Sequence, residues 1–169
     1  MNATLAAWNK ADAPVALDAM LACCGAGRWA KAMVARRPIG TVAELSEAAD
    51  QIWSTMEEAD WMEAFVCHPR IGERKAAHAS AQSVAWSKQE QSSADAAAQI
   101  VLDELAAGNA AYEQRFGFTY IVCATGKSAE EMLGILNRRL AGTREAELRE
   151  AAEQQRQITQ IRLGKWLVA

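Results

Sequence analysis

Apolar residues recur at intervals of three or four along most of the chain, which is the period of an amphipathic helix. The clearest example opens at Thr41, because Thr41 and Glu44 have the spacing of a capping box. Its apolar positions are Val42, Leu45, Ala49, Ile52 and Met56. Periodicity, caps and breakers predict further helices over residues 12–24, 29–35, 60–66, 87–115 and 128–142, and a last helix from residue 143 onward.

One stretch departs from this helical period. Phe118–Ala124 is rich in aromatic and β-branched residues, which are typical of strands. It is too short and too isolated to build a sheet, so we expect an extended connection. The predicted fold is all-α: a single-domain helical bundle of about seven to nine helices over residues 1–169, with one short extended segment near Phe118–Ala124.

The composition agrees with a helical domain and excludes several classes of protein. The hydrophobic fraction is 51%, with 10 glycines and 3 prolines, which favours helices over a sandwich, a barrel or a disordered chain. The net charge of -3 comes from acidic and basic residues in mixed order, so nucleic acid is not an expected partner. The four cysteines follow neither a disulfide framework nor a zinc-ligand pattern. Because the chain also lacks a membrane-length apolar run and a secretory signal, we expect a cytoplasmic protein that does not bind membranes.

One of only two histidines, His68, stands just past the predicted helix over residues 60–66. Pro69 disfavours helical angles at the residue before it, so we expect His68 in a loop at the helix end. An accessible imidazole in such a loop is a common choice for proton transfer, and a histidine with a purely structural partner fits the pattern equally well. Cys67 ends an apolar run, which favours a buried, inert thiol over a catalytic one.

The last predicted helix carries a charged residue within its apolar face. At about 100° per residue, Leu148, Ala152, Leu163 and Trp166 fall on one face, and Arg162 falls inside the same arc. A guanidinium in an apolar arc needs a partner, which is either an internal carboxylate or an anionic or carbonyl-bearing ligand.

Three other patterns carry little chemical information. The stretch 25–30 has the glycine spacing of a dinucleotide-binding motif, but it follows a helical pattern where that motif requires a strand. His68 and His78 lack the paired or clustered spacing of a metal site. The spacing of Ser87 and Glu90 is explained by helix capping alone.

Four segments, in this order along the chain, nevertheless form a recognisable combination. They are His68-Pro69-Arg70-Ile71-Gly72, Trp86-Ser87-Lys88-Gln89-Glu90-Gln91, Tyr112-x-x-x-Phe116-Gly117-Phe118 and Ile158-Thr159-Gln160-Ile161-Arg162-Leu163. Together they resemble the OHCU decarboxylase family, where OHCU is 2-oxo-4-hydroxy-4-carboxy-5-ureidoimidazoline, an intermediate of urate breakdown. Many members have Asp-Leu where this chain has Arg70-Ile71, which is similar to a bacterial branch, and the family's Leu-Asn before the tyrosine is Gly108-Asn109 here.

The resemblance implies an all-helical, homodimeric enzyme that converts a small-molecule substrate, OHCU, to (S)-allantoin and CO2 with no cofactor and no metal. It implies that His68 is the acid-base group and that Glu90 and Arg162 are the other catalytic residues. The further substrate-binding positions that it implies are Pro69, Ser87 and Gln91, and the backbone of Phe118, Thr119, Tyr120 and Ile121.

Two other functions stay open at the level of sequence. One is a helical ligand-binding or adaptor module, in which Ser87 and Glu90 only cap a helix and Arg162 pairs internally. The other is a hydrolase of a related ureido or imidazoline compound. Within the decarboxylase reading, His68 either removes the hydroxyl proton or delivers the proton that sets the stereocentre.

Overall fold

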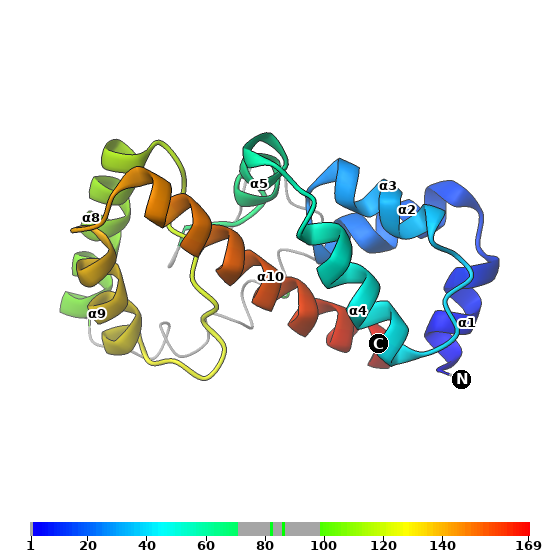
Figure 1. Ribbon diagram of the computed structural model, residues 1–169. Coiled ribbons are helices and arrows are strands. Elements are labelled where there is room, and N and C mark those ends of the chain that lie inside the picture. The colour runs from blue at the N-terminus through cyan, green and yellow to red at the C-terminus, as the bar shows by residue number, and fades with distance from the viewer. Residues whose placement is uncertain (1, 71–81, 83–85, 87–98) are drawn as a thin grey trace. The chain divides into compact units, whose positions relative to one another are not determined.

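The structure is a computed structural model that describes residues 2–70, 82, 86 and 99–169. The described residues form helices joined by turns and irregular connections, with no strand among them (Figure 1). The helices are α1 (Ala3–Lys10), α2 (Ala13–Cys23), α3 (Gly27–Ala35), α4 (Val42–Trp53), α5 (Glu58–Phe65), α8 (Gln99–Phe116), α9 (Ala129–Arg139) and α10 (Arg144–Val168). The predicted all-α class is confirmed, and the eight helices formed by the described residues lie within the predicted range.

Local caps set several of the observed helix boundaries. The Thr41 side chain accepts a hydrogen bond from the Glu44 N–H while Glu44 accepts from the Thr41 N–H, which is a complete capping box. Ser128 and Glu131 make the same reciprocal pair at the start of α9. The capping box predicted at Thr41 is therefore confirmed, and the helix predicted from residue 128 begins with a second one.

Helix α1 is not among the elements that the sequence predicted. Its N-terminus is capped by Asn2, whose side-chain oxygen accepts from the Leu5 N–H at 3.1 Å. Leu5 and Trp8 are buried, and Trp8 Nε1 donates to the Ala16 carbonyl of α2 at 2.9 Å. Two buried side chains in eight residues are too few to display a helical period, so tertiary packing decides this element.

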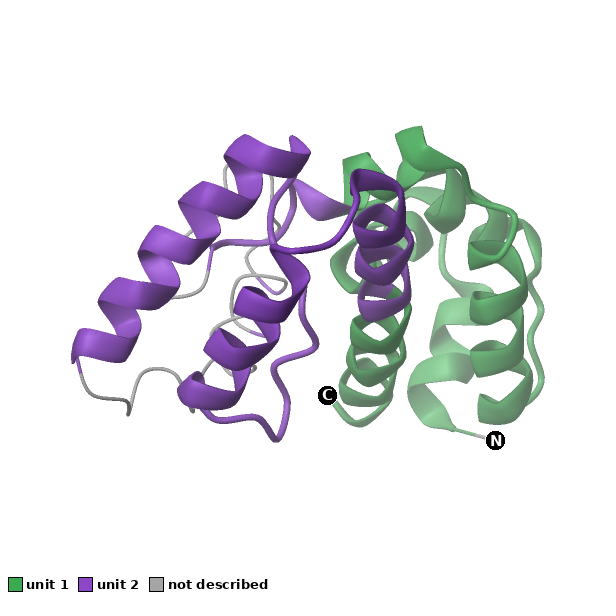
Figure 2. Ribbon diagram, turned by 60° about the vertical axis from the view of Figure 1, so that its left-hand side comes forward, with its two compact units in different colours: residues 1–64, 156–169 green, residues 65–155 purple. Residues whose placement is uncertain are grey.

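The chain forms two compact units (Figure 2). Unit 1 consists of residues 1–64 and 156–169, and unit 2 consists of residues 65–155. The N-terminal part of α10 therefore belongs to unit 2 and its C-terminal part to unit 1. The expectation of a single domain over residues 1–169 stays a prediction.

Unit 1 is built on the packing of α2 against α3 and of α3 against α4. Trp29 of α3 is fully buried, and its Nε1 donates to the Ala49 carbonyl of α4 at 3.1 Å. The C-terminal part of α10 is joined to α4 through Asp50, which accepts from Arg156 at 3.0 Å and from Gln160 at 2.8 Å. These bonds fix the stretch of α10 that continues to Arg162.

Unit 2 contains the close packing of α8 against α9. A Cβ atom added to Gly108 would lie 2.5 Å from Leu136 Cδ2, so a larger side chain at this position would collide with the buried Leu136. The glycine that departs from the family pattern is thus matched to its neighbour. Helix α8 ends before Gly117, which has a φ of +81°, a value that glycine adopts without strain.

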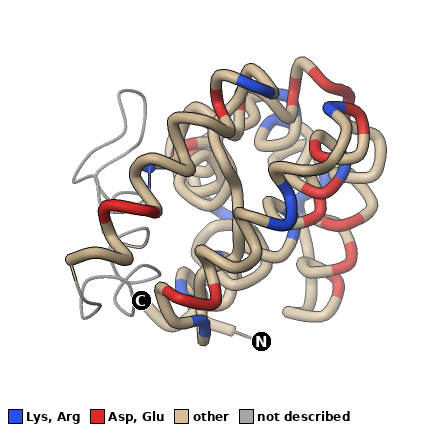
Figure 3. The backbone as a smooth tube through the Cα atoms, turned by 90° about the vertical axis from the view of Figure 1, so that its left-hand side faces the viewer, with Lys and Arg blue, Asp and Glu red and all other residues tan. Residues whose placement is uncertain are grey.

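Residues 118–124 follow Gly117 without helix or strand, as expected for an extended connection, and residues 125–128 join them to α9. Elsewhere, acidic and basic positions are mixed along the described helices (Figure 3). None of the helices in the described part of the chain is long and apolar enough to cross a membrane.

Candidate functional site

The predicted junction at His68 is present in unit 2. Helix α5 ends at Phe65, and the His68 N–H donates to the Phe65 carbonyl at 3.1 Å, which closes a turn just past the helix. His68 itself is half-buried, and Pro69 after it is buried. The backbone therefore presents the imidazole from a loop at the helix end, as the proline predicts.

The imidazole of His68 contacts a buried carboxamide. His68 Nε2 lies 2.6 Å from Oε1 of Gln155, which is in the N-terminal part of α10. Gln155 is 0% exposed, so its amide has been taken out of water entirely. A buried amide is costly unless it is hydrogen-bonded, and this contact supplies such a bond.

Arg70 fixes the chain just after Pro69. Its Nε and Nη2 donate to Oε1 and Oε2 of Glu113 in α8, both at 2.6 Å. This is the two-point geometry that guanidinium and carboxylate groups prefer. Because the Arg70 side chain is 48% exposed, the pair contributes only about 0–1 kcal/mol to stability. Its effect is to set the direction of the chain beside His68, so the arginine that departs from the family pattern has a local structural role.

Aromatic packing brings the His68 turn together with the Phe118–Ile121 segment. The ring of Phe65, the last residue of α5, lies 5.6 Å from the ring of Phe118, and Phe118 also packs edge-on against Tyr112 of α8 at 5.6 Å. Within the segment, Thr119 is half-buried and the other three residues are buried. Two parts of the predicted site, 50 residues apart in the sequence, therefore lie in one cluster of unit 2.

A buried ion pair supports the same segment. Arg139 of α9 donates from Nε to Glu147 of α10 at 2.7 Å and from Nη1 to the Ile121 carbonyl at 2.6 Å. The Tyr112 hydroxyl donates to the same Glu147 oxygen at 2.8 Å. The guanidinium carbon of Arg139 also lies 5.0 Å from the centre of the Tyr120 ring, within the range of a cation–π contact. We call Arg139, Glu147, Tyr112 and Tyr120 the Arg139 cluster.

Tyr112, Tyr120 and Arg139 each keep one protonation state near neutral pH. Burial raises the pKa of the Tyr112 and Tyr120 phenols above their ordinary value, and the positive charge of Arg139 opposes that rise without cancelling it. Burial lowers the pKa of Arg139, but Tyr112 and Glu147 outweigh burial and raise this pKa above its ordinary value. These three side chains therefore act as a fixed support around the Ile121 carbonyl and not as proton-transfer groups.

Arg162 lies in unit 1, on the C-terminal part of α10, and is 1% exposed. Leu163 and Trp166 are buried as well, so the predicted placement of Arg162 within an apolar face is confirmed. Its charge acts on Cys23 of α2: burial raises the pKa of the Cys23 thiol to about 12, and Arg162 opposes that rise. Near neutral pH Cys23 is therefore a neutral thiol and supplies no counter-charge to the guanidinium.

The structure places part of the predicted site. His68, Pro69 and the Phe118–Ile121 segment belong to unit 2, whereas Arg162 belongs to unit 1. Three predicted residues lie outside the described residues: Ser87, Glu90 and Gln91. The convergence of the three predicted catalytic residues thus stays a prediction.

Reasoning from sequence missed Gln155 and the Arg139–Glu147 pair. A signal for Gln155 existed, because it lies seven residues, or about two helical turns, before Arg162 and so falls in the same arc as the apolar positions. A polar side chain in that arc needs a buried partner, as Arg162 does. The ion pair left no comparable signal, since its partners lie on different helices.

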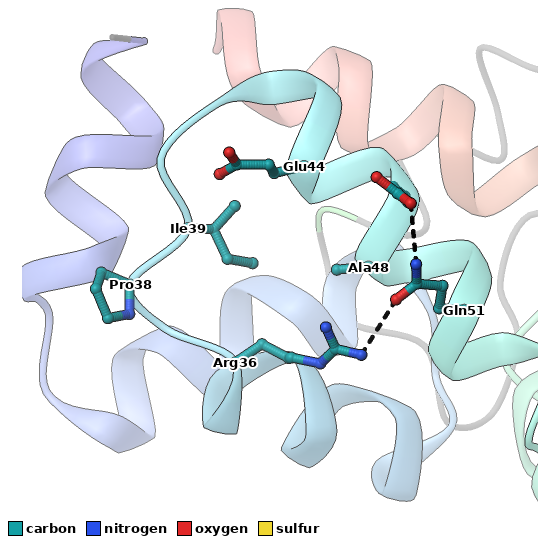
Figure 4. A pocket seen from close by; sticks show the side chains of 7 residues that line it. Arg36, Pro38, Ile39, Glu44, Ala48 and Gln51 are labelled. Atoms are coloured by element: carbon teal, nitrogen blue, oxygen red, sulfur yellow. Dashed lines mark hydrogen bonds between the residues drawn. The ribbon is translucent and has the colours of Figure 1, made fainter.

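A pocket of about 240 Å³ lies in unit 1, between the end of α3 and α4 (Figure 4). Its polar side chains bond to one another, with Arg36 donating to Gln51 at 3.2 Å and Gln51 donating to Glu47 at 3.0 Å. None of its lining residues belongs to the predicted site. In the part of the chain that the structure describes, no three His, Cys, Asp or Glu side chains are grouped to hold a metal ion.

Comparisons with known proteins show which proteins this chain is similar to. The uric acid degradation bifunctional protein TTL of Arabidopsis thaliana is 35% identical over 149 residues, which cover 88% of this chain and 46% of that protein. The chain thus spans about half the length of the curated relative that it matches. A crystal structure of OHCU decarboxylase in the presence of (S)-allantoin matches with a TM-score of 0.77 and 34% identity, over 90% of this chain and 99% of that one.

A second solved structure supports the fold alone. The crystal structure of (S)-allantoin synthase matches with a TM-score of 0.70 but only 18% identity, over 96% of this chain and 53% of that one. At the level of sequence, the model of the OHCU decarboxylase family matches residues 9–164. Since that match spans nearly the whole chain, this chain belongs to the OHCU decarboxylase family.

Proposed function

We propose that this chain decarboxylates OHCU to (S)-allantoin and CO2 without a cofactor, with His68, Glu90 and Arg162 as its catalytic residues. Family membership supports the reaction. The observation that carries the assignment of His68 is its place at the end of α5, half-buried and held by a buried carboxamide at 2.6 Å. An imidazole that is both partly accessible and fixed in orientation is suited to directed proton transfer.

The substrate explains why no cofactor is needed. OHCU carries a carboxylate on a ring carbon next to a C=N bond, so the electron pair of the breaking C–C bond moves toward the imine as CO2 leaves. The imine nitrogen and the carbon that bears the ureido group each take up a proton, and the hydroxyl loses its proton as a ring carbonyl forms. The protein has to orient the substrate, move these protons, and shield one face of the intermediate.

Each proposed residue matches one of these tasks. His68 exchanges a proton, either at the hydroxyl or at the carbon that becomes the stereocentre. Arg162 donates two hydrogen bonds to a substrate oxygen, and Glu90 accepts hydrogen bonds from the hydroxyl or the ureido N–H groups. The proposed substrate contacts are Pro69, Ser87 and Gln91, together with the backbone of Phe118, Thr119, Tyr120 and Ile121. The Arg139 cluster supports the last of these by fixing the Ile121 carbonyl.

The test is to generate OHCU in situ by oxidation of urate and to follow circular dichroism as allantoin forms. We expect the wild-type protein to produce the S enantiomer rapidly, whereas spontaneous decay gives a racemic product. His68→Ala should lose about 10²-fold or more in kcat, the range expected for a positioned acid-base group. His78→Ala, which removes the chain's other histidine, is the control and should keep wild-type activity. Wild-type activity in His68→Ala would remove His68 from the mechanism, and an inactive wild-type protein would favour the adaptor or hydrolase hypothesis.

Arg162 is tested by a variant that keeps its charge. Arg162→Lys removes the bidentate hydrogen bonding that a guanidinium can make to a substrate oxygen. We therefore expect kcat/KM to fall by about 10–100-fold, or about 1.4–2.8 kcal/mol of transition-state binding. The matched control is Arg156→Lys, at a half-buried arginine of the same helix that pairs with Asp50. Equal losses in the two variants, or a loss of folded protein in thermal melts, would show a structural role for Arg162 and contradict its assignment as a substrate contact.

We also propose that residues 1–169 act as one domain, that the protein is a homodimer, and that it is cytoplasmic. The dimer rests on family membership alone, and light scattering coupled to size-exclusion chromatography tests it. The four cysteines are thiols and not disulfides, which supports a reducing compartment. Helix α10 runs through both units, which supports one cooperative domain; two separate transitions in urea unfolding would contradict it.

A further inference from the structure

The contact between His68 and Gln155 also shows which atoms of the two side chains face each other. Gln155 is a polar side chain buried completely within unit 2, and the atom that faces His68 Nε2 is its carboxamide oxygen, at 2.6 Å. The two residues are 87 positions apart in the sequence and come from the turn after α5 and from α10. This contact is therefore a product of tertiary folding, in which one buried side chain is directed at the proposed acid-base group.

The chemistry of the two groups fixes the position of a proton. A carboxamide oxygen only accepts hydrogen bonds, and an imidazole nitrogen without hydrogen also only accepts. Two acceptors at 2.6 Å would repel each other, so Nε2 must carry the hydrogen and donate it to Gln155. In the neutral ring the lone pair then lies on Nδ1.

We propose that Gln155 is a positioning residue that sets the ring orientation and tautomer of His68, so that Nδ1 is the nitrogen that exchanges a proton with the substrate. This inference rests on the proposed function and adds to it a residue that acts through His68. A carboxamide suits the task, because it holds the Nε2 proton without adding a negative charge that would stabilise the doubly protonated ring.

The surroundings of Gln155 keep its carboxamide in place. Ala151 and Ala152, one turn earlier on α10, are buried and small, so they leave room for the side chain beside the helix. The adjacent residue, Gln154, accepts a hydrogen bond from the Cys123 N–H at 2.8 Å and so connects this part of α10 to the extended connection. Two consecutive glutamines thus link α10 to His68 and to the extended connection just after the Phe118–Ile121 segment. A group held by such packing and bonding positions its partner better than a mobile one does.

Nuclear magnetic resonance of imidazole 15N nuclei tests the tautomer directly, because the chain has only two histidines and His78→Ala assigns them. Spectra are recorded above the ordinary imidazole pKa of about 6.5, where the ring is neutral. We expect His68 to show a protonated Nε2, with a visible N–H proton, and an unprotonated Nδ1. In Gln155→Leu, which conserves volume, we expect that N–H signal to disappear and the two nitrogens to approach averaged shifts. A protonated Nδ1 in the wild type, or unchanged signals in Gln155→Leu, would overturn the proposal.

Kinetics on OHCU separate positioning from folding. Gln155→Leu should lower kcat by about 10–100-fold while KM changes by less than about threefold, since Gln155 is 0% exposed and so offers no surface for a substrate to contact. Gln155→Glu keeps an acceptor oxygen and should recover part of the lost kcat. Gln114→Leu, at an exposed glutamine of α8, is the control and should match the wild type. A rise in KM with kcat unchanged, or equal losses in Gln155→Leu and Gln155→Glu, would count against positioning. An inactive wild-type protein would refute the proposed function, and the 15N spectra would still decide the tautomer.

Discussion

The buried pair between Arg139 and Glu147 provides the sharpest test of the structural reasoning. Its N–O distance is 2.7 Å, and its side chains are 9% and 7% exposed. The chain also contains a pair of the same kind, Arg149 and Glu145 on the surface of α10, with the same distance of 2.7 Å and side chains 74% and 76% exposed. Distance and residue types are matched, whereas burial, the surrounding hydrogen bonds and the helices that carry the two partners differ. We therefore compare Arg139→Met with Arg149→Met.

The two variants should differ severalfold in their effect on stability. Arg139→Met leaves the Glu147 carboxylate buried without its counter-charge and removes the donor to the Ile121 carbonyl, so we expect a loss of about 3–5 kcal/mol. Arg149→Met removes one partner of an exposed pair at positions i and i+4, worth about 0.3–0.5 kcal/mol. At an m-value of about 2 kcal/mol per molar urea, the buried variant should lower the unfolding midpoint by about 1.5–2.5 M and the exposed one by about 0.2 M.

Urea unfolding followed by circular dichroism measures both midpoints. A loss of about 3–5 kcal/mol is a large part of the stability of a typical domain, so Arg139→Met can fail to fold. The double variant Arg139→Met/Glu147→Leu removes both charges and should be more stable than Arg139→Met alone, because no uncompensated charge is left inside. Equal midpoints for Arg139→Met and Arg149→Met, or a double variant no more stable than Arg139→Met, would refute the reasoning from burial.

Three further predictions concern packing and alkaline pH. Gly108→Leu should lower the free energy of unfolding by about 1–3 kcal/mol in urea, since even a Cβ there would lie 2.5 Å from Leu136 Cδ2; an unchanged midpoint would mean that Leu136 moves freely. The chain has only two tyrosines, Tyr112 and Tyr120, and burial raises the pKa of both phenols. Ultraviolet titration of the folded protein should therefore show no transition near pH 10.0, and tyrosinate should form only as the protein unfolds. Burial raises the pKa of Cys23 from 9.0 to about 12, so the unfolded chain releases this proton above pH 9 while the folded chain keeps it. The free energy of unfolding should therefore fall between pH 9 and about 12. Its slope against pH should be steeper in the wild type than in Cys23→Ala, by up to about 1.4 kcal/mol per pH unit. Equal slopes of the two proteins in urea unfolding would contradict the burial of this thiol.

The sequence by itself determined the elements that depend on neighbours along the chain. The capping box at Thr41 formed as predicted, and the helix predicted from residue 128 begins with a box of the same kind, because a cap joins residues only three positions apart. Pro69 placed His68 past the end of α5 for an equally local steric reason. Helix α1 was not predicted, because a short helix with two buried side chains shows no clear helical period of apolar residues and depends on packing for its stability.

Partners from different elements were decided only by the tertiary structure. The bond between His68 and Gln155 joins residues 87 positions apart, and the Arg139–Glu147 pair joins α9 to α10. Helical periodicity reports which face of a helix is buried, but it does not report which other helix covers that face. The sequence could therefore identify a histidine at a helix end and a charge inside an apolar arc. The fold was needed to show which side chain orients that histidine, because hydrogen-bond partners are set by packing in three dimensions and not by spacing along the chain.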